Sequence, residues 1–220
     1  MTLKSRIVCA MAASWALSAF LSPVAATEGS AAQQVLFADF GGATASADVR
    51  YTAARILASS DNQGWPFVIV DKKDARIFVF QADGQLVGAS AALLGLASGD
   101  HSVPGIGSRE PSKILPFERT TPSGRFLSQP GRNLDGEEVV WINYTEGLAI
   151  HRVRPGQSQE RRLQRLASST PDDNRVSLGC VVVPVAFFEE VVQPVLGKNY
   201  SVVYVLPETR AAHALFAQRP

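Results

Sequence analysis

Short runs of β-branched and aromatic residues, separated by charged or glycine-containing turns, dominate the chain from Pro66 onward. The first two, "FVIVD" (67–71) and "RIFVF" (76–80), are joined by a charged turn. Runs of this length and composition are typical of strands linked in hairpins. Later runs of the same kind are "QLVGASAALLG" (85–95), "GRFLS" (124–128), "EVVWINY" (138–144), "LAIHRV" (148–153) and "YSVVYVL" (200–206). We therefore predict a mainly β domain.

A few short helices are expected at the edges of this β domain. Residues 46–59 have apolar side chains at helical spacing behind a possible Ser46 cap, and 158–167 and 184–196 also read as helices. The last of these is expected to bury one apolar stripe: Val185, Phe188, Val192 and Val195. Between the strands, the loop 98–123 is long for a compact domain, which favours a functional role or mobility.

The amino terminus has the pattern of a secretory signal peptide. Lys4 and Arg6 precede an apolar run, and small residues follow it before Thr27. We expect a signal peptide at 1–26, a tether and helix at 27–64, a single catalytic domain at 65–206 and a tail at 207–220. The protein is then periplasmic or otherwise extracytoplasmic. An uncleaved anchor is the alternative.

Composition excludes some classes of partner. The chain holds 21 basic and 20 acidic residues, and loss of Lys4 and Arg6 would leave it close to neutral. Nucleic-acid binders are normally basic as a whole, so none is expected as a partner. Outside the signal, the sequence has no apolar run long enough to span a membrane.

Cys180 is the only cysteine outside the predicted signal, which contains Cys9. Exported proteins usually pair their cysteines. An odd cysteine is therefore a buried inert side chain, a reactive thiol or half of an intermolecular disulfide, and composition alone leaves all three open.

A reactive thiol needs a base, and histidine is the usual one. Three histidines are available. His151 follows an apolar strand that would hold its ring at a sheet edge, although it could instead be a structural histidine. His101, in the long loop, is a possible substrate contact, and His213 lies in the tail.

Ser177 and Gly179 flank the thiol in "RVSLGCVVVP" (175–184). A small neighbour lets backbone N–H groups approach an oxyanion that develops on the substrate. The plain structural alternative is that Gly179 serves the turn alone.

Three motifs together resemble the L,D-transpeptidase (YkuD-type) catalytic domain: "TPSGRF" (121–126), "AIHRV" (149–153) and "SLGCV" (177–181). The opening hairpins at 66–87 are also similar to that family. The resemblance covers about 65–206 and implies a β-sandwich or open barrel with a few short peripheral helices.

The resemblance also implies a peptidoglycan cysteine acyltransferase without a metal or an organic cofactor. Cys180 would attack the carbonyl of the third stem residue, usually diaminopimelate, and release D-alanine. The acyl group would pass to an amine of a second stem or of a protein. His151 would be the base, the carbonyl of Arg152 would orient its ring, and the N–H groups of Gly179 and Cys180 would hold the oxyanion.

Three positions depart from the family pattern. Leu178 replaces a common histidine, Val182 replaces a common arginine or asparagine, and Arg152 replaces a common glycine. Two alternatives stay open: a hydrolase that uses the same acyl-enzyme, and a cell-wall binding protein with weakened catalysis.

Arginines between the two catalytic candidates are candidate ligands for substrate carboxylates, Arg154 and Arg175 among them. A solvated basic face paired with Glu160, Asp172 and Asp173 is the alternative.

Overall fold

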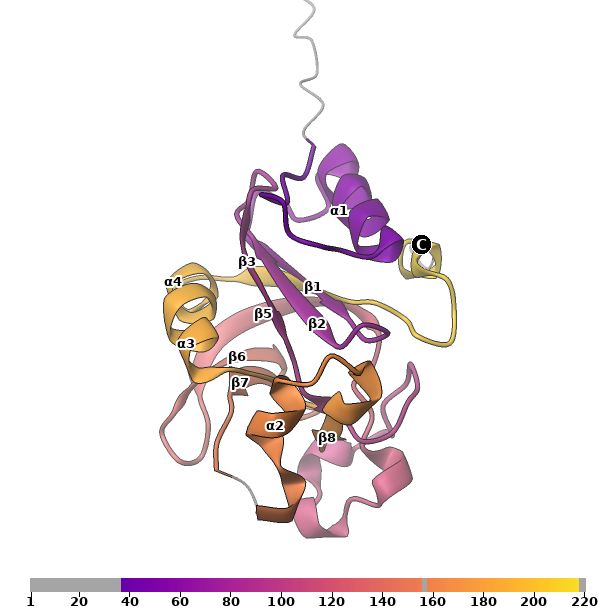
Figure 1. Cartoon of the computed structure of the whole chain (residues 1–220), viewed down its shortest axis with the longest axis vertical. Coiled ribbons are helices and arrows are strands. Elements are labelled where there is room, and N and C mark those ends of the chain that lie inside the picture. Colours follow the sequence, from indigo (N-terminus) through magenta and orange to yellow (C-terminus); the bar gives the residue numbers. More distant parts are fainter. Residues whose placement is uncertain (1–36, 156–157, 218–220) are drawn as a thin grey trace, which may run out of the picture. The chain divides into compact units, whose positions relative to one another are not determined.

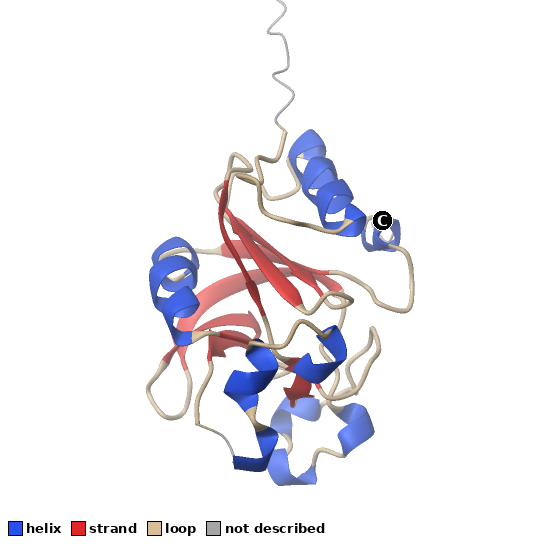
Figure 2. Cartoon of the chain, viewed as in Figure 1, coloured by secondary structure: helices blue, strands red, loops and turns tan. Residues whose placement is uncertain are grey.

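The computed structural model describes residues 37–155 and 158–217. The expected signal peptide, the first part of the tether and the last three residues of the tail lie outside them. Within the described residues the fold is mainly β, as predicted, and strands form its centre (Figure 2). The strands are β1 (Phe67–Asp71), β2 (Arg76–Phe80), β3 (Leu86–Ala91), β4 (Leu94–Gly95), β5 (Gly124–Arg132), β6 (Glu138–Asn143), β7 (Leu148–Arg152), β8 (Arg175–Ser177), β9 (Val181–Val183) and β10 (Ser201–Val205).

Eight of these strands form one sheet in the order β3-β2-β1-β10-β5-β6-β7-β9 (Figure 1). Two neighbouring pairs are parallel, β1 with β10 and β7 with β9, and the other pairs are antiparallel. The remaining two strands, β4 and β8, pair in parallel as a separate ribbon. Both strands that flank the predicted nucleophile, β8 and β9, therefore pair with segments far away in sequence.

The large sheet curls until its two edges meet. Just after β3, Leu93 exchanges backbone hydrogen bonds of 2.7 and 2.9 Å with Val182 of β9. One apolar core then fills the interior, with residues from both halves of the sheet, such as Val79 and Val203 on one side and Ile150 and Val181 on the other. Joining the edges in this way also removes an exposed strand edge at β9.

A second apolar core lies between the other face of β1, β2 and β10 and the helix α1 (Ala47–Ser59). The Ser46 hydroxyl accepts a hydrogen bond from the N–H of Val49, so the predicted cap is confirmed. The 3-10 turn Ala212–Leu215 lies beside α1 (Figure 1), and Phe216 packs on the same core. Tail residues up to 217 are thus part of the packed domain.

Two other helical regions lie near the predicted places. They are α2 (Arg162–Leu166) and the pair α3 (Val185–Phe187) and α4 (Gln193–Leu196), which a π-helical turn joins. Phe188 and Val192 are buried as predicted, but Val185 is exposed. The prediction for Val185 was wrong, because this residue is the first of α3 and lies at the exposed end of the helical segment. Beyond the π-helical turn (Phe188–Val192), which breaks the regular 3.6-residue period, Leu196 is fully buried and Val195 only partly.

A buried ion-pair cluster, Lys72 with Asp100, joins three distant segments and was not predicted. Lys72 Nζ lies 2.9 Å from Asp100 Oδ1, and both side chains are almost completely buried. Asp100 also accepts hydrogen bonds from the backbone N–H groups of Glu208 (2.8 Å) and Thr209 (3.1 Å). The cluster therefore ties the β1–β2 turn and the long loop to the tail.

No helix in the described part of the chain is long and apolar enough to cross a membrane.

Candidate active site

The register between β7 and β9 places His151 and Cys180 on the same face of the sheet. In this parallel pair, Ile150 lies opposite Val181 and His151 opposite Val182. Side chains alternate along a strand, and Ile150 and Val181 face the interior core. His151 and Cys180, one residue away from them, therefore both point to the opposite face. Cys180 lies two residues before Val182, which is opposite His151. The Cα atoms of His151 and Cys180 are therefore about 8 Å apart.

A cleft of about 640 Å³ opens on this face and contains both side chains. Its walls come from the long loop, the β5–β6 hairpin, β6, β7 and the turn before β9. The lining residues include Ser102, Ile106, Thr120, Pro122, Trp141, Tyr144, Glu146, His151, Arg154, Arg162, Leu178, Gly179 and Cys180. The predicted functional role of the long loop is consistent with its place in this wall.

The turn that carries Cys180 is held from within by Ser177. The Ser177 hydroxyl donates to the carbonyl of Cys180 (2.7 Å) and accepts from the N–H of Gly179 (3.0 Å). Gly179 has a φ of 139°, a region that favours glycine. A Cβ at this position would also lie 2.8 Å from the carbonyl oxygen of Thr120. Glycine is thus required both by the backbone angle and by close packing.

This geometry corrects one expectation about the oxyanion. The N–H of Gly179 was a predicted oxyanion donor, but it donates to Ser177 instead. An N–H that already has a partner inside the turn is not available to a substrate. Of the two expected donors, only the N–H of Cys180 stays a candidate.

His151 has a defined orientation. Its Nδ1 lies 2.8 Å from the carbonyl oxygen of Arg152. Because a carbonyl can only accept, Nδ1 carries the proton, and Nε2 of the neutral ring keeps a free lone pair. The Arg152 side chain itself turns away, since its guanidinium lies over the Phe188 ring (4.8 Å) and pairs with Glu189 (3.1 Å).

The electrostatics favour a neutral pair at rest. Burial lowers the pKa of His151 below its ordinary value, and the hydrogen bond to Arg152 opposes that shift. Burial raises the pKa of the Cys180 thiol, while the Ala149 backbone and the Arg154 charge act in the other direction. At neutral pH the cleft therefore holds a protonated thiol and a neutral imidazole.

The Cys180 thiol donates to the carbonyl of Gly147, with Sγ 3.4 Å from the oxygen. Gly147 belongs to the turn between β6 and β7, and the neighbouring Glu146 accepts a hydrogen bond of 2.5 Å from Ser102 of the long loop. The thiol is half-buried and unbridged. An accessible thiol in a cleft disfavours the inert reading of this cysteine.

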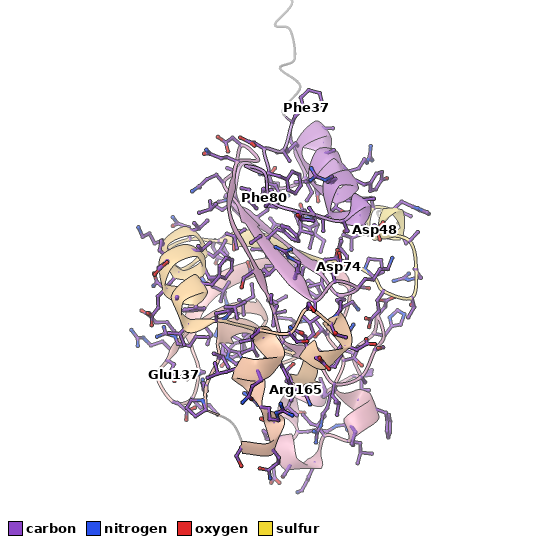
Figure 3. All side chains as sticks on the ribbon, in the orientation of Figure 1. Phe37, Asp48, Asp74, Phe80, Glu137 and Arg165 are labelled. Atoms are coloured by element: carbon purple, nitrogen blue, oxygen red, sulfur yellow. The ribbon has the colours of Figure 1, made fainter. Side chains whose placement is uncertain are left out.

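Arg154 alone of the predicted substrate-binding residues lines the cleft. It pairs with Asp135 (2.8 Å) and with Glu137, on the β5–β6 hairpin (Glu137 is labelled in Figure 3). Arg162 also lines the cleft, and it pairs with Glu160 (2.7 Å). The alternative, in which these arginines pair with acidic residues, therefore describes much of the segment between His151 and Cys180. Arg154 and Arg162 still reach the cleft.

Two predicted substrate contacts lie elsewhere. Arg175 pairs with Glu208 and donates to the Lys72 carbonyl (3.0 Å), so it belongs to the buried ion-pair cluster. His101 is exposed and does not line the cleft. Proximity in sequence thus did not bring these two side chains to the cleft wall, and Arg175 is held elsewhere by its pairing with Glu208.

The two departures at Leu178 and Val182 have different surroundings. Leu178 is partly exposed and lines the cleft. Val182 is buried against Leu93 and Val153. Leu178 thus presents an apolar side chain to the cleft, whereas Val182 belongs to a buried apolar cluster.

Sequence reasoning missed the aromatic wall of the cleft. Trp141 and Tyr144 pack edge to face with ring centroids 5.1 Å apart. The alternation along β6 was the available signal, because Val140 and Ile142 face the core and Trp141 must then face the other side.

No protein-family model and no curated protein matches the chain. Among solved structures, an L,D-transpeptidase from Xylanimonas cellulosilytica is similar over 64% of this chain and 60% of that one, at 15% identity and a TM-score of 0.39. A mutant of the Enterococcus faecium L,D-transpeptidase is 18% identical over 64% of this chain and 49% of that one, with a TM-score of 0.36. The catalytic domain of an E. faecium L,D-transpeptidase, solved by NMR, is 17% identical over 65% of this chain and 98% of that domain, with a TM-score of 0.37. The match thus spans about half to three fifths of the two longer chains.

Proposed function

We propose that this protein is a cysteine acyltransferase of the L,D-transpeptidase type that acts on peptidoglycan stem peptides outside the cytoplasm. One observation carries the proposal: three motif segments far apart in sequence meet at one cleft. Pro122, from the first segment, lines the cleft together with His151 and Cys180, and so does Thr120, which directly precedes that segment. A signal peptide at 1–26 and a tether before the domain are parts of the same proposal.

In the first half-reaction, Cys180 is the nucleophile and His151 the general base. Nε2 of His151 takes the thiol proton as Sγ bonds to the carbonyl carbon of the third stem residue. The C–N bond to D-alanine then breaks, and the imidazolium returns the proton to the leaving amine. In the second half-reaction, an amine attacks the thioester and the thiol is restored.

The neutral resting pair defines how the thiol is activated. A preformed thiolate is not the stable form where burial raises the pKa of Cys180 and lowers that of His151. Proton transfer must then accompany the attack. The sulfhydryl also has to leave the carbonyl of Gly147, by rotation about the Cα–Cβ bond.

A carbapenem tests the proposal directly, because its β-lactam carbonyl can acylate an activated thiol. Mass spectrometry should find an adduct on the peptide that contains Cys180, and no adduct would contradict both enzyme readings. With disaccharide-tetrapeptides as substrate, cross-linked dimers would identify a transferase. Tripeptides without dimers would instead identify a hydrolase that uses the same acyl-enzyme.

The pH dependence of this acylation should reveal the base. Because the pKa of His151 lies below its ordinary value, the imidazole stays neutral as the pH falls from 8 to about 6.5. The acylation rate is expected to be flat over that range and to fall only at lower pH. In His151→Ala the rate should instead rise about tenfold per pH unit up to the raised pKa of the thiol. Parallel profiles for the two proteins would contradict a role for His151 as base.

Arg154 is proposed to favour the thiolate through its charge. Arg154→Met removes this charge, and the pKa of Cys180 should rise, to an extent limited by Asp135 and Glu137, which partly neutralise the guanidinium. The pH dependence of Cys180 alkylation measures this pKa. Arg165→Met is the matched control, since Arg165 donates to the carbonyls of Glu160 and Asp173 outside the cleft.

A further inference from the structure

Thr121 lies between the buried ion-pair cluster and the turn that carries Cys180. It is completely buried. Its hydroxyl donates to the carbonyl of Gly179 (2.7 Å) and accepts from the N–H of Gly95 (2.8 Å). Its own carbonyl accepts from Lys72 Nζ (2.9 Å). One side chain and one carbonyl thus connect three segments that are distant in sequence.

Close backbone packing leaves these segments no freedom to slide. A Cβ on Gly95 would lie 2.3 Å from the carbonyl oxygen of Arg119 and 2.7 Å from the N of Thr121. A Cβ on Gly179 would lie 2.8 Å from the carbonyl oxygen of Thr120. The backbone around Thr121 therefore touches both β4 and the nucleophile turn without any intervening side chain.

The other end of this connection is rigid. Lys72 Nζ binds the carbonyls of Gly99 and Thr121 as well as the Asp100 carboxylate. All three ammonium protons thus have partners inside the protein. A cation with fully satisfied, buried partners has one stable position, so the Thr121 carbonyl has a fixed anchor.

We propose that Thr121 is a positioning residue for Cys180, with Lys72 and Asp100 as its anchor. The Thr121 hydroxyl holds the Gly179 carbonyl from outside the turn, and Ser177 holds the turn from within. Together they fix where Sγ lies relative to His151 and Gly147. The consequence for catalysis rests on the function proposed above, but the effect on the place of the thiol does not.

Thr121→Val is the direct test, because it replaces the hydroxyl with a methyl group of similar size. We expect carbapenem acylation of Cys180 to slow by about 100-fold at saturating carbapenem, the effect of a displacement of about 1 Å. The apparent affinity for carbapenem should change little. Thr121→Ser keeps the hydroxyl and should restore most of the rate.

Ser128→Ala is the matched control for a purely structural role. Ser128 is also completely buried, and its hydroxyl donates to the Ser201 carbonyl (2.9 Å) between β5 and β10, away from the cleft. It should lower the unfolding midpoint and leave the acylation rate unchanged. A Thr121→Val protein that is folded, less stable and still acylated at the wild-type rate would overturn the proposal.

Two further measurements keep the result interpretable. If Thr121→Val does not fold, Thr121→Ala and Thr121→Ser decide, since both lose the methyl group and only serine keeps the hydroxyl. Equal acylation rates for these two variants would refute the proposal.

If the wild type forms no carbapenem adduct, chloroacetamide alkylation above the thiol pKa still reports the position of Cys180, because it needs no base. Alkylation should then be faster in Thr121→Val than in Ser128→Ala, and equal rates would count against Thr121 as a positioning residue.

Discussion

Replacing His151 with alanine is expected to slow acylation of Cys180 by about 10²- to 10⁴-fold at neutral pH, the usual contribution of a general base. The thiol is protonated at rest because burial raises its pKa. Without Nε2 of His151, no positioned group in the proposed mechanism takes the proton when Sγ attacks. Stopped-flow measurement of carbapenem acylation, with the adduct assigned by mass spectrometry, gives the rate.

His101→Ala is the matched control for this experiment. His101 is exposed and outside the cleft, so its loss should change neither the rate nor the stability. Cys180→Ala should abolish the adduct. A His151→Ala protein that keeps the wild-type rate would show that another group is the base, and equal loss of rate in His101→Ala would point to an effect of the long loop instead.

Replacing Asp100 with alanine is expected to lower the free energy of unfolding by about 3 kcal/mol, the lower end for a broken buried ion pair, because the buried Lys72 ammonium loses its closer carboxylate and keeps only Glu208 at 3.7 Å. The N–H groups of Glu208 and Thr209 also lose the carboxylate that accepts their hydrogen bonds. Urea unfolding at pH 7, followed by tryptophan fluorescence, measures the change.

Glu110→Ala is the control for a pair in water. Glu110 lies 3.1 Å from Lys113, but both side chains are about two-thirds exposed or more, so its loss should change the free energy of unfolding by less than about 1 kcal/mol.

The pH dependence of the stability that Asp100 contributes has a definite sign. Burial alone would raise the pKa of Asp100, but the hydrogen bonds from Thr209 and Lys72 outweigh it and hold that pKa below its ordinary value. The stability that this carboxylate contributes is thus present above about pH 4 and is lost as the pH falls further. If the two variants unfold alike, the buried cluster is not a determinant of stability.

The two effects bear on the same cleft from opposite ends. His151 acts on the thiol directly, whereas Asp100 holds Lys72, and Lys72 holds the carbonyl of Thr121. Loss of His151 should slow acylation and leave the fold intact. Loss of Asp100 should destabilise the fold and, through Thr121, displace the Cys180 thiol.

Local patterns made much of the fold predictable. Alternating β-branched and aromatic residues identified β1 and β2 with their observed bounds, and Ser46 identified the start of α1. Such patterns work because backbone propensity and capping depend on near neighbours. The exceptions among the helices are Val185, which lies at the exposed start of α3, and Val195, since the π-helical turn before it leaves Leu196 as the fully buried residue instead.

The sequence by itself determined which reactive groups are present: Cys180 alone outside the predicted signal, His151 on a strand, and Gly179 next to the thiol. Tertiary structure alone decided which groups meet. The parallel register of β7 and β9 placed His151 and Cys180 on one face, and pairing with Glu208 took Arg175 away from them. Ser177 accepts the hydrogen bond from the N–H of Gly179. Thr121 bonds to both the buried Lys72 ammonium and the turn that carries Cys180. Apart from the bond within the Ser177–Gly179 turn, these contacts join residues up to 58 positions apart, and no local pattern carries them, because they depend on how whole segments pack once the sheet has closed.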